Sequence, residues 1–225
     1  MAEERGSDPA VADPDGAQLS TGTAMLDEWM SGGIHAGSVV ALVSPPDSPA
    51  EELLYPVVDA NPGRYLSLLR PPTEVDRHAA ALGFDGVEAI PVESSPLLND
   101  PAGSLSGLAP ESVVVVDPVT ELEREGRDRY LEFLVTLHRA VVTTDSVAVL
   151  HCPRMNPRAL QRDLTLVRAD TVLEVLVQRS TDRSGPPRSR WFLTAAKARF
   201  GRLPETALAV EFGAEGGLGP ADDEQ

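Results

Sequence analysis

Short apolar runs that alternate with helical patterns are the feature that most limits how this chain can fold. Val113–Val116 is an unbroken run of four valines that ends at Asp117, a pattern typical of a buried parallel strand. An amphipathic helical pattern follows over residues 127–142, and another apolar run occupies Val147–Leu150. Because parallel strands need a long crossover connection, usually a helix, this order predicts an α/β fold with a mostly parallel central sheet flanked by helices.

The same alternation continues through the rest of the chain. We expect further strands over residues 38–43, 65–69, 87–92, 171–178, 191–198 and 207–212, and further helices over 51–60, 73–82 and 157–167. The segment 94–110 is predicted to be rich in loops. Since no helical pattern separates the three closing strands, they predict an antiparallel extension at one edge of the sheet.

The two ends of the chain differ in composition from the middle. Residues 1–18 and 213–225 are rich in Asp, Glu, Gly, Ala and Pro, which predicts disordered acidic tails around one domain at 19–212. The N-terminus lacks the apolar stretch of a secretory signal, and no apolar run is long enough to cross a bilayer. We therefore expect a cytoplasmic protein with no membrane partner.

The net charge of −16 comes from 35 acids against 19 basic residues, and Lys197 is the only lysine. Such a composition is typical of haloarchaeal proteins, because molar salt screens the self-repulsion of a strongly acidic surface. An acidic protein from a bacterium with a high-GC genome is the alternative. Cys152 is the only cysteine, which excludes an intrachain disulfide and a cysteine-based metal cluster.

Four short motifs, three of which contain glycine, lead into the first expected strand. They read Leu19-Ser20-Thr21-Gly22, Leu26-Asp27-Glu28, Gly32-Gly33-Ile34 and Gly37-Ser38-Val39-Val40. This order resembles the opening of KaiC- and RadA-type ATPases of the RecA superfamily, and residues 77–85, 113–117, 169–175 and 197–199 resemble later segments of the same family. The resemblance implies a RecA-like P-loop NTPase fold that ends in antiparallel hairpin strands.

The phosphate loop departs from that family. A working loop reads G-x-x-x-x-G-K-[ST], in which backbone N–H groups and the Lys bind phosphate and the hydroxyl binds Mg²⁺. The matching residues here include Ser44, Asp47, Ser48, Pro49, Ala50 and Glu51. Ala50 stands at the Lys position, Glu51 at the hydroxyl position, and Pro49 has no N–H to offer. The sequence therefore predicts a degenerate phosphate loop.

The residues after this loop also predict a local helix start. In Ser48-Pro49-Ala50-Glu51 the serine is a candidate N-cap, the proline suits the first helical position, and the glutamate suits the third. Since a helix N-terminus attracts anions, we expect the carboxylates of this segment to stand where phosphate would otherwise bind.

The carboxylates that position the attacking water in the family are also missing. Leu69 and Arg70 occupy the corresponding positions after the second expected strand. Asp117 remains at the Walker B position, where we interpret it as a polar residue that caps or bonds a loop. We expect a pseudo-ATPase rather than an enzyme, with no cofactor and no metal.

His151 and Cys152 follow a central strand, where α/β proteins build their sites. A Cys–His pair is a candidate nucleophile or metal site. However, adjacent strand residues point to opposite faces of a sheet, so we expect no dyad and a buried, inert Cys152.

Eleven of the 19 basic residues lie between Arg154 and Arg202. We predict that this segment forms a partner interface, with Arg154, Arg158 and Arg162 as a stripe on one helix face if the helix begins by Arg154. The other candidate interface residues are Arg183, Arg188, Arg190, Lys197 and Arg199. If instead the helix starts at Pro157, Arg154 lies on the preceding loop.

Three functions stay open on the sequence. The first is a non-catalytic regulatory or assembly partner that docks on another copy of itself or on an intact paralogue. The second is a KaiC-like protein that binds nucleotide between protomers through Lys197 and Arg199. The third is a RadA-paralogue-like accessory in DNA recombination or repair. The negative charge of the chain weighs against the third, and the degenerate loop weighs against the second.

Overall fold

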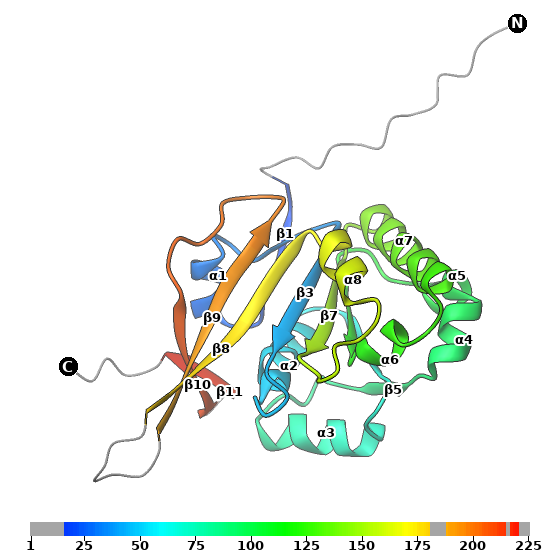
Figure 1. Ribbon diagram of the computed structural model, residues 1–225. Coiled ribbons are helices and arrows are strands. Elements are labelled where there is room, and N and C mark those ends of the chain that lie inside the picture. Colours follow the sequence, from blue (N-terminus) through cyan, green and yellow to red (C-terminus); the bar gives the residue numbers. More distant parts are fainter. Residues whose placement is uncertain (1–15, 181–187, 215–216, 221–225) are drawn as a thin grey trace, which may run out of the picture.

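The computed structural model describes residues 16–180, 188–214 and 217–220 (Figure 1). Most of its strands belong to a nine-stranded sheet in the order β11-β10-β9-β8-β3-β7-β6-β4-β5. They are β3 (Ser38–Ser44), β4 (Gly63–Ser67), β5 (Ala89–Pro91), β6 (Val113–Asp117), β7 (Val147–Pro153), β8 (Thr171–Ser180), β9 (Arg188–Ala198), β10 (Leu208–Ala214) and β11 (Gly217–Pro220). The strands from β8 to β5 in this order run parallel, and β9, β10 and β11 extend the sheet in antiparallel fashion.

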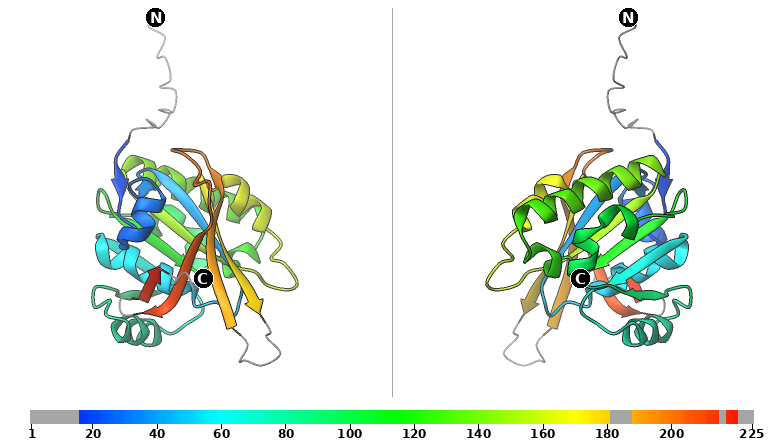
Figure 2. Two further views of the ribbon diagram at one scale, coloured as in Figure 1. Left: turned by 90° about the vertical axis from the view of Figure 1, so that its left-hand side faces the viewer. Right: turned by 90° about the vertical axis from the view of Figure 1, so that its right-hand side faces the viewer.

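Helices cover both faces of this sheet (Figure 2). One face carries α1 (Ala24–Trp29), the short 3₁₀ helix η1 (Ala50–Leu53), α2 (Tyr55–Ala60) and α3 (Pro72–Ala81). The other carries α4 (Ser94–Asn99), α5 (Pro101–Ser104), α6 (Thr120–Glu123), α7 (Arg127–Thr143) and α8 (Arg162–Arg168). The fold class predicted from the alternation of elements is confirmed. None of the helices in the described ranges has the length and apolar character needed to cross a membrane.

Strand periodicity explains why the central strands are apolar throughout. In β6, Val113 and Val115 pack in the core under α1, α2 and α3, whereas Val114 and Val116 pack in the core under α7. Successive side chains of a strand point to opposite faces, so a strand with helices on both sides needs apolar residues at every position. All four valines are buried completely.

The Ser-Thr-Gly motif near the N-terminus anchors α1. The Asp27 carboxylate accepts hydrogen bonds from the Thr21 amide and hydroxyl, both at 2.7 Å, and from the Ser20 hydroxyl at 2.6 Å. Gly22 has a φ of +78°, and a Cβ there would lie 2.0 Å from the carbonyl oxygen of Pro56. Only glycine fits this backbone conformation and this close approach. The motif and α1 lie between β1 (Gln18–Leu19) and β2 (Ile34–His35), which pair in a small antiparallel sheet.

Several boundaries differ from the sequence prediction. The segment 94–110 contains α4 and α5 rather than loops alone, because Leu97 and Leu98 are drawn into the core under α7. The expected helix over 51–60 is split into η1 and α2, with Pro56 in the first turn of α2, where a missing N–H does no harm. The expected C-terminal tail contains the end of β10 and all of β11. Residues 1–15 of the expected N-terminal tail lie outside the described ranges.

Candidate functional site

Four polar side chains meet toward the carboxyl ends of adjacent parallel strands. Ser44 ends β3, His151 lies near the end of β7, Asp117 ends β6, and Tyr65 lies in β4. Ser44, Asp117 and His151 are each an even number of residues from an apolar residue of their own strand in the core under α1, α2 and α3. Tyr65 belongs to that core itself, so all four side chains point to that face of the sheet. The strand order β3-β7-β6-β4 then sets them side by side.

Asp117 is the centre of this cluster. Its Oδ1 accepts a hydrogen bond from His151 Nδ1 at 2.5 Å, and its Oδ2 accepts from the Tyr65 hydroxyl at 2.5 Å and from Arg70 Nη2 at 2.9 Å. His151 Nε2 in turn lies 2.9 Å from the Ser44 hydroxyl. Ser44, Asp117 and His151 are 1%, 3% and 6% exposed. Each polar side chain of this cluster therefore has a hydrogen-bond partner within the protein.

Arg70 joins the cluster to the loop at residues 44–51. Its guanidinium reaches Asp117 through Nη2 and the Glu51 carboxylate through Nη1, at 3.2 Å. The Ser67 hydroxyl donates to the carbonyl of Arg70 at 2.7 Å, which holds the turn after β4 in place. Position 70, where the family resemblance leads us to expect an acid, thus carries a cation that pairs with Asp117. We call Ser44, Tyr65, Arg70, Asp117 and His151 the Asp117 network.

The groups of the Asp117 network shift the pKa values of Asp117 and Arg70 toward their charged forms. Burial alone would raise the pKa of the Asp117 carboxyl, but the hydrogen bond and charge of His151, with Tyr65 and Arg70, hold that pKa well below its usual value. Burial would lower the pKa of Arg70, and the neighbouring Tyr65, Asp117 and Glu51 raise it above its usual value instead. Burial also raises the pKa of Tyr55, which packs beside Tyr65, to about 12. Asp117 and Arg70 are therefore a stable ion pair at neutral pH.

The line Ser44–His151–Asp117 has the order of a hydrolytic triad, but it lacks the rest of the machinery. In such enzymes backbone N–H groups, often including that of a residue next to the nucleophile, stabilise the oxyanion. Here the residue after Ser44 is Pro45, which has no N–H. The Ser44 side chain is also buried. The geometry thus favours a closed, structural network over acyl transfer.

The loop residues predicted to replace the phosphate-binding sequence lie next to this network. Asp47 is exposed and pairs with Arg179, Ala50 is completely buried, and Glu51 pairs with Arg70. The predicted capping box is wrong. The Ser48 hydroxyl donates back to the Pro45 carbonyl at 2.7 Å, and Pro49 rather than Ser48 precedes η1, with no side-chain cap. The physical reason is that the Ser48 hydroxyl hydrogen-bonds within its own turn, to the Pro45 carbonyl, instead of capping the helix.

Glu52, one residue beyond the loop, ties it to the last part of the sheet. Its carboxylate is buried and accepts a hydrogen bond from the Gly213 amide at 2.6 Å. Burial raises the pKa of Glu52, although the hydrogen bond from Gly213 opposes that rise. The Glu52 carboxylate is therefore committed to the backbone of β10.

The predicted arginine stripe does not form. Helix α8 begins only at Arg162, so Arg154 and Arg158 lie on the preceding connection and pair with Glu174 at 2.9 Å and Asp163 at 2.6 Å. Arg162 points inward and is 4% exposed. Its Nε donates to both oxygens of the fully buried Glu123, at 2.7 and 2.9 Å, and its other nitrogens reach Thr120 and the carbonyls of Cys152 and Pro153. Arg162 is therefore a core residue, and the carboxylate of Glu123 with these further acceptors offsets the cost of burying its charge.

The remaining interface candidates differ in what surrounds them. The Lys197 ammonium donates to the carbonyls of Leu166, Val167 and Ala169 at the end of α8, and Arg199 pairs with the buried Asp170 at 2.8 Å. Arg190 is exposed on β9. Arg183 lies outside the described residues, and the side chain of Arg188 does too. The basic segment therefore neutralises acids of its own chain at most of its described positions.

The partners of Asp117 and Glu123 are the residues that sequence reasoning missed. For the residues around Asp117 the sequence held one signal, because strand alternation puts Ser44, Tyr65, Asp117 and His151 on the same face of the sheet. No signal existed for Arg162, whose spacing from Arg158 suggested a surface stripe. Cys152 is buried on the face opposite His151, as expected, and burial raises its pKa to about 12. Within the described ranges, no group of three or more His, Cys, Asp or Glu side chains is arranged to hold a metal.

Comparison with known proteins identifies a family model that matches the chain and a solved structure that shares its fold. A model described as "Family of unknown function (DUF7125)" matches residues 18–221. Among solved structures, the KaiC-like protein PH0186 of the hyperthermophilic archaeon Pyrococcus horikoshii shares the fold with a TM-score of 0.73 and 14% sequence identity, over 92% of this chain and 99% of that chain. No curated protein matches the chain significantly. The KaiC-like RecA fold predicted from the motifs is therefore confirmed.

Proposed function

We propose that this chain, which belongs to the DUF7125 family of unknown function, is a KaiC-like RecA-fold protein that does not hydrolyse ATP and acts as a regulatory or assembly partner. One observation carries the proposal. In P-loop NTPases the Walker B aspartate and the loop hydroxyl hold Mg²⁺. Here the carboxylate at that position, Asp117, is already neutralised by the guanidinium of Arg70 at 2.9 Å.

The loop itself supports the same conclusion. Pro45, Pro46 and Pro49 remove three backbone N–H groups from the segment that would cradle phosphate. Asp47 and Glu51 add negative charge there, and Glu51 is held in place by Arg70. A nucleotide would have to break the Arg70 ion pairs before its phosphates met any cation of this site.

The two alternative functions find less support in the contacts. Lys197 and Arg199, the residues for a nucleotide site between protomers, are committed to helix α8 and to Asp170. Arg154 and Arg158, which would meet a DNA backbone, are paired with acids. Neither alternative has an observation of its own in its favour.

We expect no binding of Mg-ATP in calorimetry at molar KCl, with no turnover in a phosphate-release assay. The physical reason is the missing Lys and hydroxyl together with the occupied Asp117. The variant Arg70→Ala, which frees Asp117 but leaves the prolines, should also fail to bind. A low-micromolar dissociation constant for the wild-type protein would refute the pseudo-ATPase part of the proposal.

The role as a partner is tested separately. We expect the tagged protein at molar KCl either to self-associate in light scattering or to retain a co-expressed, catalytically intact KaiC-like paralogue in a pull-down. The variant Arg190→Glu changes an exposed base of the proposed interface and should weaken that association without changing the melting temperature. A monomer that retains no paralogue would contradict the role.

The haloarchaeal character is likewise a proposal, supported by the net charge of −16. We expect the melting temperature to rise by many degrees as KCl is raised from about 0.1 M to about 1 M, because the Debye length falls from about 10 Å to about 3 Å. Thermal melting followed by circular dichroism checks this. A flat profile would favour an ordinary acidic protein.

A further inference from the structure

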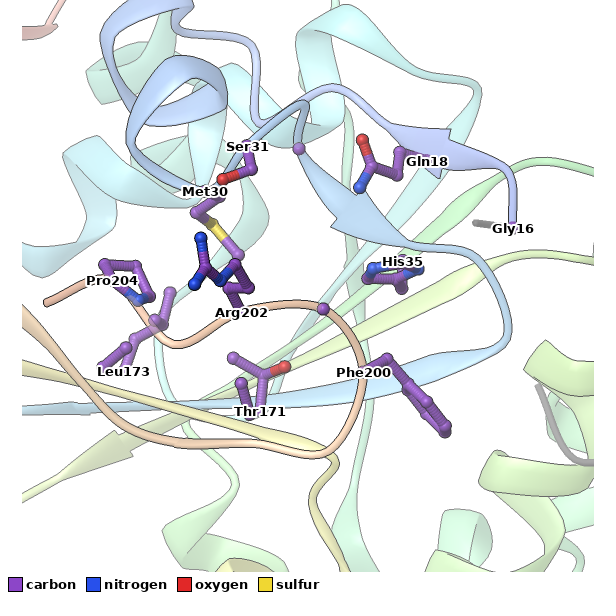
Figure 3. Close-up of a pocket in the computed structure, with 14 residues that line it drawn as sticks. Gly16, Gln18, Met30, Ser31, His35, Thr171, Leu173, Phe200, Arg202 and Pro204 are labelled. Atoms are coloured by element: carbon purple, nitrogen blue, oxygen red, sulfur yellow. The ribbon is translucent and has the colours of Figure 1, made fainter. Parts of the chain in front are cut away.

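A cavity of about 340 Å³ lies at the opposite end of the molecule from the Asp117 network. Its lining comes from the β1–β2 sheet, the end of α1, the first residues of β8 and the connection between β9 and β10 (Figure 3). Thr171 opens β8 here, and β3 runs from this end, at Ser38, to the Asp117 network, at Ser44. The cavity is thus separate from the degenerate phosphate loop and independent of the function proposed above.

The walls of the cavity are held in place at several points. The connection from β9 to β10 is fixed at its start by the Arg199–Asp170 ion pair, and near its end by the Trp29 indole, which donates to the Thr206 carbonyl at 2.9 Å. Gly201 has a φ of +73°, and a Cβ there would come within 3.0 Å of the His35 ring. The connection therefore closes over His35 in one defined path, and the hollow is preformed.

The charge of the lining differs from that of the chain. The sequence has 35 acids and 19 basic residues, yet the lining formed by the described residues holds Arg202 and His35 and no acid. Gln18 and Ser31 add an amide and a hydroxyl, and Figure 3 shows them round the same hollow as the Arg202 guanidinium. In a chain with a net charge of −16, this site offers hydrogen-bond donors and a positive charge to an anion.

The other side chains of the lining are mainly apolar. Met30, Leu173, Phe200 and Pro204 line the same cavity as these polar groups. Small-molecule sites usually combine apolar side chains with a few convergent polar groups, and this lining presents both. The planar fork of an arginine matches the two oxygens of a carboxylate or a phosphate. We propose that this cavity binds a small organic anion, with Arg202 holding its carboxylate or phosphate group and the apolar walls holding its body.

The test is a chemical-shift titration of the ¹⁵N-labelled full chain with phenyl phosphate, benzoate and benzamide. Benzamide has the same ring as benzoate but no charge. We expect at least one of the two anions to shift the amide signals of residues 31–35 and 199–204, and benzamide to bind at least about tenfold more weakly. The ratio between phenyl phosphate and benzoate identifies the preferred anionic group.

Two variants assign the effect to Arg202. Arg202→Gln should weaken the anion by at least about tenfold, whereas Arg77→Gln, the same charge change at an exposed position of α3, should leave binding unchanged. Both side chains are exposed, so both variants should melt as the wild type does, and melting is measured in parallel. The proposal is overturned if neither anion shifts these signals, if benzamide binds equally well, or if the two variants behave alike.

Discussion

Replacing Arg162 by methionine should destabilise the fold by about 3–5 kcal/mol, because it leaves the carboxylate of Glu123 buried without its counter-ion. Glu123 is completely buried, and Arg162 donates to both of its oxygens. The same guanidinium also satisfies carbonyls at the end of β7 and so joins α6, β7 and α8. Urea unfolding at constant KCl, followed by circular dichroism, measures the loss.

Two controls separate the buried charge from the general loss of a base. Arg158→Met removes an arginine four residues away whose ion pair is exposed, with side-chain exposures of 58% for Arg158 and 84% for Asp163, and should change stability by less than about 1 kcal/mol. Adding Glu123→Gln to Arg162→Met should recover a large part of the loss, since no charge then stays buried. Equal effects of Arg158→Met and Arg162→Met would show that Arg162 is a surface residue after all.

The second large effect is expected at Asp117. Asp117→Ala should cost roughly 3 kcal/mol, because it removes the common acceptor of Tyr65, Arg70 and His151 and leaves their donors unsatisfied. Asp47→Ala is the matched control. It also removes one negative charge, but from an exposed pair, so its effect should stay below about 1 kcal/mol. Equal urea midpoints for the two variants would contradict a structural role for the Asp117 network.

Asp117 also predicts a pH dependence with a definite sign. Its pKa in the folded protein lies below the unfolded value of about 3.9, so the unfolded chain takes up the proton first as pH falls. The stability that Asp117 contributes is therefore fully present above about pH 5 and is lost as the pH falls below about 4. Asp170, whose pKa is also lowered, adds to this slope in the wild type and persists in the variant. Asp117→Ala should accordingly flatten the acid limb of the urea midpoint, and an unchanged slope would refute the assignment.

If both expectations hold, the polar groups at the carboxyl edge of the sheet stabilise the fold. RecA-like enzymes keep this edge open for nucleotide and metal. Here Arg70 and His151 occupy the carboxylate that a metal would need, and the prolines of the loop remove its phosphate donors. Under our proposals, the surface and the opposite cavity are the places where partners and ligands meet the chain.

The order of the elements and the chemistry missing from positions 44–51 could both be predicted from the sequence, because each can be read locally. Strand and helix differ in their apolar period, and a missing Lys or a proline without an N–H is a property of the residue alone. The burial of the four valines before Asp117 and the opposite orientation of His151 and Cys152 also follow from strand alternation, and both are as the sequence indicated.

The pairing of the polar groups, in contrast, could be learned only from the folded chain. Arg162 and Glu123 are 39 residues apart, Tyr65 and Asp117 are 52 apart, and Ser44 and His151 are 107 apart. Their meeting depends on the strand order β3-β7-β6-β4 and on the late start of α8, neither of which follows from a local period. A buried charge is tolerated only where its counter-ion comes from elsewhere in the chain. Because Glu123 is distant in sequence, the local spacing of Arg162 could not distinguish a buried arginine from a surface one.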